Sequence, residues 1–324
     1  MGRSPEAIIE YIMNDFVICF NAVVPVFLYM LIGYGARRIG LLTIQHVTVF
    51  NRICFNLFLP VNLFNCIYGS DFSQAVRPRL IVFAVVGVLL AALLSLPAAA
   101  AFTKQRSQRG VTAQALFRSN FVLIGLAVAE NLLPGESVAA VAVLSAIIIP
   151  IFNVLAVIIL SVYSGQSIEY RDIGLKILTN PLIISASAAV LLLLLGIHLP
   201  TSLRTTLNGL GAVATPLTLF LLGAFFCFDN LDIYKHLLCV ICIGKLLLCP
   251  AVFLTTGYFL GFRGVEFAGL IGIFATSTSV SSCAMAQQIG GDDKLAASAI
   301  VMTNLLCPLT MFGWSILFKA LGAF

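Results

Sequence analysis

The chain has 324 residues, of which 60% are hydrophobic and 10% are charged, and its formal net charge is +5. A soluble domain carries about 25% charged residues, so this composition cannot cover a water-facing exterior. The mean hydropathy is +1.08, and several apolar runs exceed the roughly 18 residues of a membrane span. The sequence therefore predicts an all-α integral membrane protein. A membrane β-barrel would need alternating polar positions, and no basic run indicates a nucleic-acid partner.

Ten membrane-spanning helices are predicted from the apolar runs. In chain order they cover 16–36, 46–67, 79–101, 113–133, 137–163, 178–198, 203–227, 234–260, 265–289 and 294–320. The connections between them are short, and the segment 164–176 is the candidate central linker. No small-residue cleavage site separates the first run from the spans that follow, so no cleavable signal peptide is expected.

The positions of Lys and Arg predict the orientation, because cytoplasmic loops carry an excess of these residues. If the N-terminus lies outside, nine of them fall inside and six fall outside. The first two cytoplasmic loops hold five of the nine, namely Arg37, Arg38, Lys104, Arg106 and Arg109. Both termini are therefore expected to lie outside the membrane-enclosed compartment.

The two halves of the chain repeat each other. Four matches occur in the same order at offsets of 156 to 158 residues: "PVNLF" (60–64) with "PLTLF" (216–220), "FRSN" (117–120) with "FATS" (274–277), "AVAEN" (127–131) with "AMAQQ" (284–288), and Pro150 with Pro308. The chain is therefore divided into units 1–165 and 166–324, each with five spans. Because five is odd, the second unit enters the membrane from the opposite side, and such an inverted repeat is typical of secondary transporters.

Polar residues gather at membrane depth in two equivalent spans. The fourth span holds Ser119, Asn120 and Gly125, and the ninth holds "TSTSVSS" (276–282). The candidate site residues in the latter are Ser277, Thr278, Ser281 and Ser282. We expect both helices to be interrupted there and to cross near the midplane, with hydroxyl and amide groups satisfying the freed backbone. The alternative is that these small residues only let helices pack closely.

The second span carries an asparagine stripe beside a proline. At about 100° per residue, Asn51, Asn62 and Asn65 fall within a sector of about 60°, and Pro60 is expected to kink the helix. Pro216 and Thr218 repeat the arrangement in the seventh span. The stripe is interpreted either as a substrate path or as a set of amides that bond a neighbouring helix.

The deep ionisable groups are mainly cationic. They are Arg118, Arg52 and Lys245, and no Asp lies in the middle of a span. Together with half-helix N-termini, these groups predict an electropositive interior suited to an organic anion, particularly a carboxylate. Arg52 and Arg118 can alternatively extend to the cytoplasmic surface. For Lys245 we expect backbone carbonyls or Ser, Asn or Gln side chains as partners.

An enzyme and a channel are the competing classes. His46, His198 and His236 lie near span ends, without the spacing of a metal-binding HExxH motif. The "CVIC" at 239–242 is interpreted as packing rather than as redox or metal chemistry. No catalytic residue, metal or cofactor is therefore expected, and an intramembrane enzyme and an anion channel stay as alternatives to a transporter.

Four stretches carry a resemblance to a known family. "MLIGYGARRIGLL" (30–42), "FNLFLPVNLF" (55–64), "RSNFVLIGLAV" (118–128) and "MAQQIGGDDKLAASAIVMTNLLCPLT" (285–310) together resemble the auxin efflux carriers, which include bacterial dicarboxylate permeases and the plant PIN carriers. The resemblance implies ten helices in two inverted five-helix repeats with helices four and nine crossed, as in sodium–proton antiporters and bile-acid symporters. It also implies a scaffold from helices 1, 2, 6 and 7, a transport domain from helices 3–5 and 8–10, elevator-type transport, a homodimer and the inner membrane of a bacterium.

Carried over by motif, Asn120 matches the crossover asparagine of that family and Gly125 matches a family glycine. The family's two crossover prolines are missing, since Ala127 and Ser277 stand in their places. We expect Ser119 and Asn120 to line the site, with Arg118 adding positive potential. The absence of a mid-span carboxylate favours uniport or exchange, although hydroxyl and amide oxygens leave sodium or proton coupling open.

Overall fold

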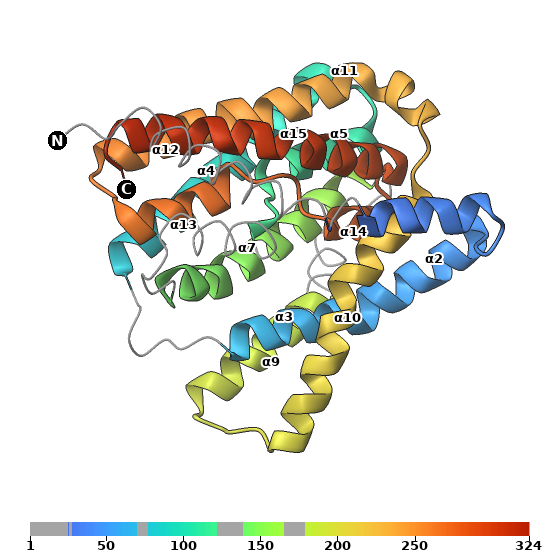
Figure 1. Cartoon of the computed structure of the whole chain (residues 1–324), viewed down its shortest axis with the longest axis horizontal. Coiled ribbons are helices and arrows are strands. Elements are labelled where there is room, and N and C mark those ends of the chain that lie inside the picture. The colour runs from blue at the N-terminus through green and yellow to red at the C-terminus, as the bar shows by residue number, and fades with distance from the viewer. Residues whose placement is uncertain (1–24, 26–27, 70–76, 122–138, 165–178, 324) are drawn as a thin grey trace, which may run out of the picture.

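The computed structural model describes residues 25, 28–69, 77–121, 139–164 and 179–323. Within these residues the chain is helical and contains no strand, and its one β-type contact is an isolated bridge between Ser119 and Thr278. The helices pack into one elongated body, with most of the long ones running along its long axis (Figure 1).

Six helical stretches in the described residues are long and apolar enough to cross a membrane. They are Ile44–Tyr68, Pro78–Phe102, Val143–Tyr163, Thr201–Phe225, Asn230–Phe259 and Asp293–Ala320. Two shorter apolar helices, α9 (Pro181–Leu194) and α13 (Gly264–Phe274), lie where the sixth and ninth spans were predicted. The prediction of a membrane protein is confirmed, whereas the count of ten spans stays a prediction.

One predicted boundary is wrong. The fourth span was expected to start near residue 113, but its helix α5 covers Arg106–Phe117. Its first turn contains Arg106, Gln108 and Arg109, which lower the local hydropathy. The apolar run therefore begins later in the sequence than the helix does. The rest of that span, residues 122–133, lies outside the described residues.

A first group of helices lies in the lower part of Figure 1. It consists of the helix at 28–38, α2 (Ile44–Ile53), η1 (Cys54–Phe58), α3 (Leu59–Tyr68), α9 and α10 (Thr201–Phe225). The helix at 28–38 approaches α10 very closely, because a Cβ atom on Gly33 would lie 1.9 Å from the Phe220 carbonyl oxygen and one on Gly223 would lie 1.9 Å from the Met30 carbonyl oxygen. Such glycine contacts are a common means of packing helices in membranes.

A second group fills the upper part of Figure 1. It consists of α4 (Pro78–Phe102), α5, α7 (Ala139–Tyr163), α11 (Asp229–Ile243), η3 (Gly244–Leu248), α12 (Cys249–Phe259), α13, α14 (Ser281–Ile289) and α15 (Asp293–Ala320). α4 packs against α5, α11 against α15 and α5 against α7. Most of the buried apolar side chains of the main core, such as Phe267, Ile271 and Ile300, belong to this group.

Two π-helical turns precede prolines. η1 comes just before Pro60 in α3, and η3 comes just before Pro250 in α12. Because proline has no amide hydrogen, Pro250 leaves the carbonyl of Leu246 without its helical donor, and the indole Nε1 of Trp314 donates to that oxygen at 3.0 Å. The bond allows the irregular turn to lie inside the membrane body.

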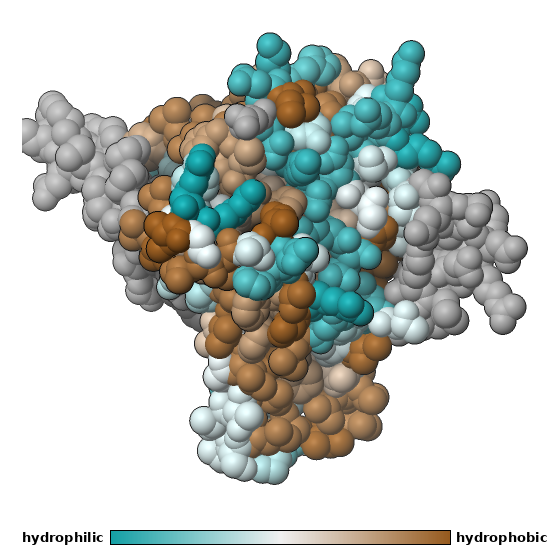
Figure 2. Space-filling model, turned by 90° about the vertical axis from the view of Figure 1, so that its right-hand side faces the viewer, coloured by the Kyte–Doolittle hydropathy of each residue, from teal (hydrophilic) through white to brown (hydrophobic). Residues whose placement is uncertain are grey.

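Apolar side chains cover much of the surface. Val82 and Leu93 in α4, Leu191 in α9 and Leu309 in α15 are each more than half exposed. Figure 2 views the right-hand end of Figure 1, where hydrophilic side chains gather above a column of hydrophobic ones. A helical body with apolar sides and a polar end is the arrangement expected of a multi-pass membrane protein.

Candidate functional site

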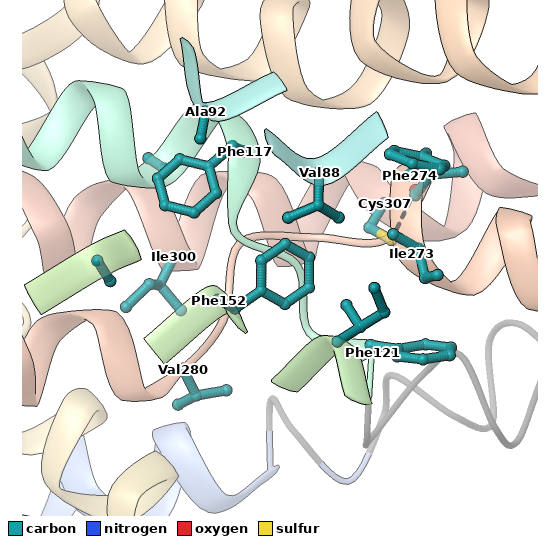
Figure 3. Packing of buried hydrophobic residues seen from close by; sticks show 14 of the residues in the cluster. Val88, Ala92, Phe117, Phe121, Phe152, Ile273, Phe274, Val280, Ile300 and Cys307 are labelled. Atoms are coloured by element: carbon teal, nitrogen blue, oxygen red, sulfur yellow. Dashed lines mark hydrogen bonds between the residues drawn. The ribbon is translucent and has the colours of Figure 1, made fainter. Parts of the chain in front are cut away.

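Two helices are interrupted at the same point in the second group. α5 ends at Phe117 and the chain continues in an extended conformation, with φ −78° and ψ 126° at Arg118. α13 ends at Phe274, and six non-helical residues lead to α14. The two non-helical stretches pair, because the backbone N–H of Asn120 donates to the Ser277 carbonyl at 2.8 Å and Ser119 bridges Thr278. Figure 3 shows them passing each other beside Val88 and Phe152.

The broken end of α5 exposes carbonyl groups that need donors. The hydroxyl of Thr278 donates to the Ala115 carbonyl at 3.0 Å. The ammonium of Lys245 donates to the Phe117 carbonyl at 3.4 Å and is completely buried. Lys245 therefore has the backbone partner that the sequence predicted, and its positive charge faces the negative end of a helix dipole.

Hydrogen bonds with α15 hold the segment 275–280 in place. The hydroxyl of Ser277 donates to the side-chain oxygen of Asn304 at 2.9 Å, and the Thr278 amide donates to the Thr303 hydroxyl at 3.2 Å. The hydroxyl of Thr276 bonds back to the Gly272 carbonyl at 2.9 Å. These hydroxyls thus replace the helical hydrogen bonds lost at the break.

A cavity of about 90 Å³ lies between the two helix groups, next to the crossing. Six residues predicted for the site line it: Arg118, Ser119, Asn120, Ser281, Asn62 and Thr218. Asn62 comes from α3 and Thr218 from α10, in the first group, whereas the other four come from the second group. The structure therefore brings residues from four distant segments to one cavity.

Arg118 is the charged member of the cavity lining and is 3% exposed. One of its terminal nitrogens, Nη2, donates to Asn153 Oδ1 at 2.6 Å and to the Ser281 hydroxyl at 2.7 Å, while Nη1 contacts the Met285 sulfur at 2.6 Å. No carboxylate of the described residues lies within ion-pair distance of it. A buried cation without a counter-charge is costly, so the site is suited to an anion.

Two further polar groups of the lining make no hydrogen bond. These are the hydroxyl of Ser119 and the amide nitrogen of Asn120, both buried beside the cavity and both without a partner in the described part of the chain. Buried polar atoms in native proteins are almost always paired with protein, water or ligand. Unpaired donors next to Arg118 are the pattern expected of a binding site.

The other predicted site residues lie elsewhere. Ser277 and Thr278 hold the crossing together, as described above, and do not line the cavity. The hydroxyl of Ser282 is buried without a described partner, also outside the cavity lining. Gly125 lies outside the described residues. Their roles in binding stay predictions.

The two prolines that were predicted to kink their helices lie in different local structures. Pro60 stands at the start of α3, directly after the π-helical turn, whereas α10 runs from Thr201 to Phe225 without interruption through Pro216. Two residues beyond Pro216, the hydroxyl of Thr218 donates to the Ala214 carbonyl at 2.6 Å and lies 3.1 Å from the Cys54 sulfur.

The asparagine stripe separates into three environments. Asn62 lines the cavity, Asn51 donates to the side chain of Gln287 in α14, and Asn65 donates to the Leu207 carbonyl at 2.7 Å. The sector of about 60° assumed a regular α-helix, but the π-helical turn Cys54–Phe58 lies between Asn51 and the others and changes the register. The prediction of one continuous polar face is therefore wrong.

Three polar lining residues were missed by the sequence analysis: Asn153 in α7, Thr215 in α10 and Ser279 in the crossing segment. Asn153 is 4% exposed and follows Pro150 in an otherwise apolar run. A polar residue at that depth was itself a detectable signal. In the described residues no group of three or more His, Cys, Asp or Glu side chains is placed to hold a metal ion.

Comparison with known proteins gives a family but no single relative. A family model described as membrane transport protein matches residues 18–315, which is nearly the whole chain. A comparison with curated proteins yields no match. The matched family is one of transporters rather than enzymes, and its span includes both interrupted helices and every residue of the cavity lining. The chain therefore belongs to the membrane transport protein family, that of the auxin efflux carriers which its motifs resemble.

Proposed function

We propose that this protein is a secondary transporter that carries a small organic anion, a carboxylate, across the membrane. The observation that carries the proposal is Arg118, a buried guanidinium in a cavity without a described carboxylate partner. A carboxylate would accept hydrogen bonds from Arg118, from the Asn120 amide and from the Ser119 hydroxyl. Each of these would be stronger than a neutral hydrogen bond because the acceptor is charged.

The helix arrangement supports the same charge preference. α14 begins at Ser281, whose hydroxyl contacts both Arg118 and Ser279 at the cavity. The first turn of a helix carries partial positive charge and free amide groups, which favour an anion. The C-terminal end of α5, which carries the opposite partial charge, is bonded by Lys245 and Thr278 instead.

An inverted repeat is supported by how the equivalent residues meet. Asn120 and Ser277, which the offset of 157 makes equivalent, are the two residues joined by the backbone bond of the crossing. Asn62 and Thr218, equivalent at an offset of 156, line the same cavity. Pairs of equivalent residues would meet in this way if an axis in the membrane plane passed through the crossing.

An elevator mechanism is supported by the division into two helix groups. The cavity lies on their boundary, and a second cavity of about 370 Å³ lies on the same boundary between α7 and α9. We propose that the second group moves against the first and carries the anion with Arg118, Ser119 and Asn120. The Asn51–Gln287 hydrogen bond, which joins α2 to α14, would break in that movement.

The proposal includes exchange or uniport, with both termini outside. No Asp or Glu of the described residues lines the cavity, so a buried carboxylate that relays protons has no candidate there. We place the protein in the inner membrane of a bacterium, as a homodimer.

Uptake into proteoliposomes tests the proposal. A panel of labelled mono- and dicarboxylates is offered under imposed voltage, pH and sodium gradients. We expect saturable uptake of at least one anion by the wild type and loss of uptake in Asn120→Ala, with the thermal stability in detergent unchanged because the amide nitrogen makes no hydrogen bond to a described residue.

The matched control is Asn56→Ala. Asn56 is exposed, and its amide nitrogen donates to the Arg52 carbonyl one turn earlier in the same helix. This variant should transport like the wild type. Normal uptake by Asn120→Ala would contradict the site, and failure of the wild type to take up any anion under every gradient would contradict the proposed function.

A further inference from the structure

The charge of the cavity lining is limited to one side chain. Among the described residues that line it, Arg118 is the one cationic group. Lys245, the other fully buried cation, does not line the cavity, since its ammonium donates to the Phe117 carbonyl. Of the described lining, a bound anion therefore meets one full positive charge.

The first helix group presents neutral groups to the same cavity. Asn62 and Thr215 line it with an amide and a hydroxyl. The Thr218 hydroxyl is already committed to the Ala214 carbonyl. Leu59, Leu63, Cys66 and Leu182 complete that side of the lining. An amide and a hydroxyl can bond a neutral polar group of a ligand, but they cannot neutralise a second carboxylate.

We propose that the cavity selects a compact monocarboxylate that carries a neutral hydrogen-bonding group, and that it discriminates against dicarboxylates. The carboxylate binds Arg118, Ser119 and Asn120, and the neutral group binds Asn62 and Thr215. A dicarboxylate would bring a second buried charge without a partner, which proteins tolerate poorly. This inference rests on the proposed function and specifies the substrate class of the same site.

Pairs of diacids and their half-amides test the inference. Succinate and succinamate have nearly the same size and differ by one charge, as do malonate and malonamate, and glutarate and glutaramate. Each member is measured as a competitor against the anion that the uptake panel identifies. We expect the half-amides to compete at least ~100-fold more effectively than the diacids, the size of effect expected for an unpaired buried charge.

The pH dependence of the probes gives a second readout. Half-protonated succinate carries one charge, so competition by succinate should increase as the pH is lowered, whereas competition by succinamate should change little. A cavity that accepts dianions would show no such increase.

Asn62→Arg adds a second cation to the cavity and should shift the preference towards the diacids. Asn56→Arg adds the same charge at an exposed position outside the lining and should leave the preference unchanged. If Asn62→Arg does not fold, the comparison of the pairs in the wild type still decides the question.

The outcomes separate the inference from the proposed function. Diacids that compete as well as their half-amides, failure of both members of every pair, or a dicarboxylate as the transported anion would overturn the inference while leaving a transporter. Absence of uptake for every anion in the panel would overturn the proposed function itself.

Discussion

The two non-helical segments at the crossing differ in what their polar groups do. In the segment 118–120, the Ser119 hydroxyl and the Asn120 amide nitrogen have no described partner, and Arg118 has no described counter-charge. In the segment 275–280, the side chains of Thr276, Ser277 and Thr278 all donate to other protein groups. The polar groups of segment 118–120 are therefore free to bind a ligand, whereas Thr276, Ser277 and Thr278 of the other segment hold the crossing together.

This difference follows from the neighbours of each segment. α15 passes beside residues 275–280 and supplies Asn304 and Thr303 as partners. Residues 118–120 border the cavity between the helix groups, as do Ser279 and Val280 at the far end of the other segment. Mutations should therefore affect transport in the first segment and stability in the second, and they can be ordered by the size of the expected effect.

The largest effect is expected for Arg118→Gln. It removes the one cation of the described lining, so uptake should fall at least ~100-fold. Thermal stability in detergent should change less, because loss of a buried charge without a described counter-charge offsets loss of the hydrogen bonds to Asn153 and Ser281. Arg52→Gln, which changes an exposed arginine outside the cavity, is the control and should transport normally. If the Arg118→Gln variant still took up the anion, segment 118–120 would not be the binding segment, and the proposed difference between the two segments would be wrong.

For Ser277→Ala we expect a smaller effect, which falls on stability rather than on uptake. The variant leaves the buried side-chain oxygen of Asn304 without its donor, which should lower the free energy of unfolding by about 1–3 kcal/mol. Uptake per folded molecule should change little. Ser119→Ala is the comparison, since its hydroxyl bonds no described residue, so the variant should lower uptake without lowering stability. If Ser277→Ala lost uptake at full stability, both segments would be binding segments.

The smallest effect is expected for Thr278→Val. The two side chains have nearly the same shape, so the change removes chiefly the hydrogen bond to the Ala115 carbonyl. Denaturation in detergent should show a loss of about 1 kcal/mol, with uptake per folded molecule unchanged. A larger loss would mean that this bond is needed to keep α5 interrupted at Phe117.

The location of the membrane body and of the crossing could be predicted from the sequence. Apolar runs mark the long helices because lipid-facing surface must be apolar, and the hydroxyl-rich stretch 276–282 marks a break because broken helices need local donors. The start of α5 could not be predicted in this way, since its first turn is polar.

The direction in which each polar side chain points could not be predicted from the sequence. Ser277 and Ser281 lie four residues apart in one stretch, yet Ser277 bonds Asn304 and Ser281 lines the cavity. Asn51 and Asn62 were assigned to one face, but a π-helical turn between them changes the helical register by one residue, or about 100°. The direction of each side chain depends on which helices pack beside it, and composition and residue spacing do not specify that packing.

The close contacts at Gly33 and Gly223 have a consequence for the surrounding lipid. The helix at 28–38 touches α10 backbone to backbone there, with no room for even a methyl group. Just beyond, the Arg37 guanidinium donates to the Ala224 carbonyl at 2.9 Å, at the end of α10. An acyl chain cannot wedge between helices in such contact, so the seam is sealed against the bilayer. If one helix group slides while the other stays in place, these two helices would remain joined as part of the stationary wall.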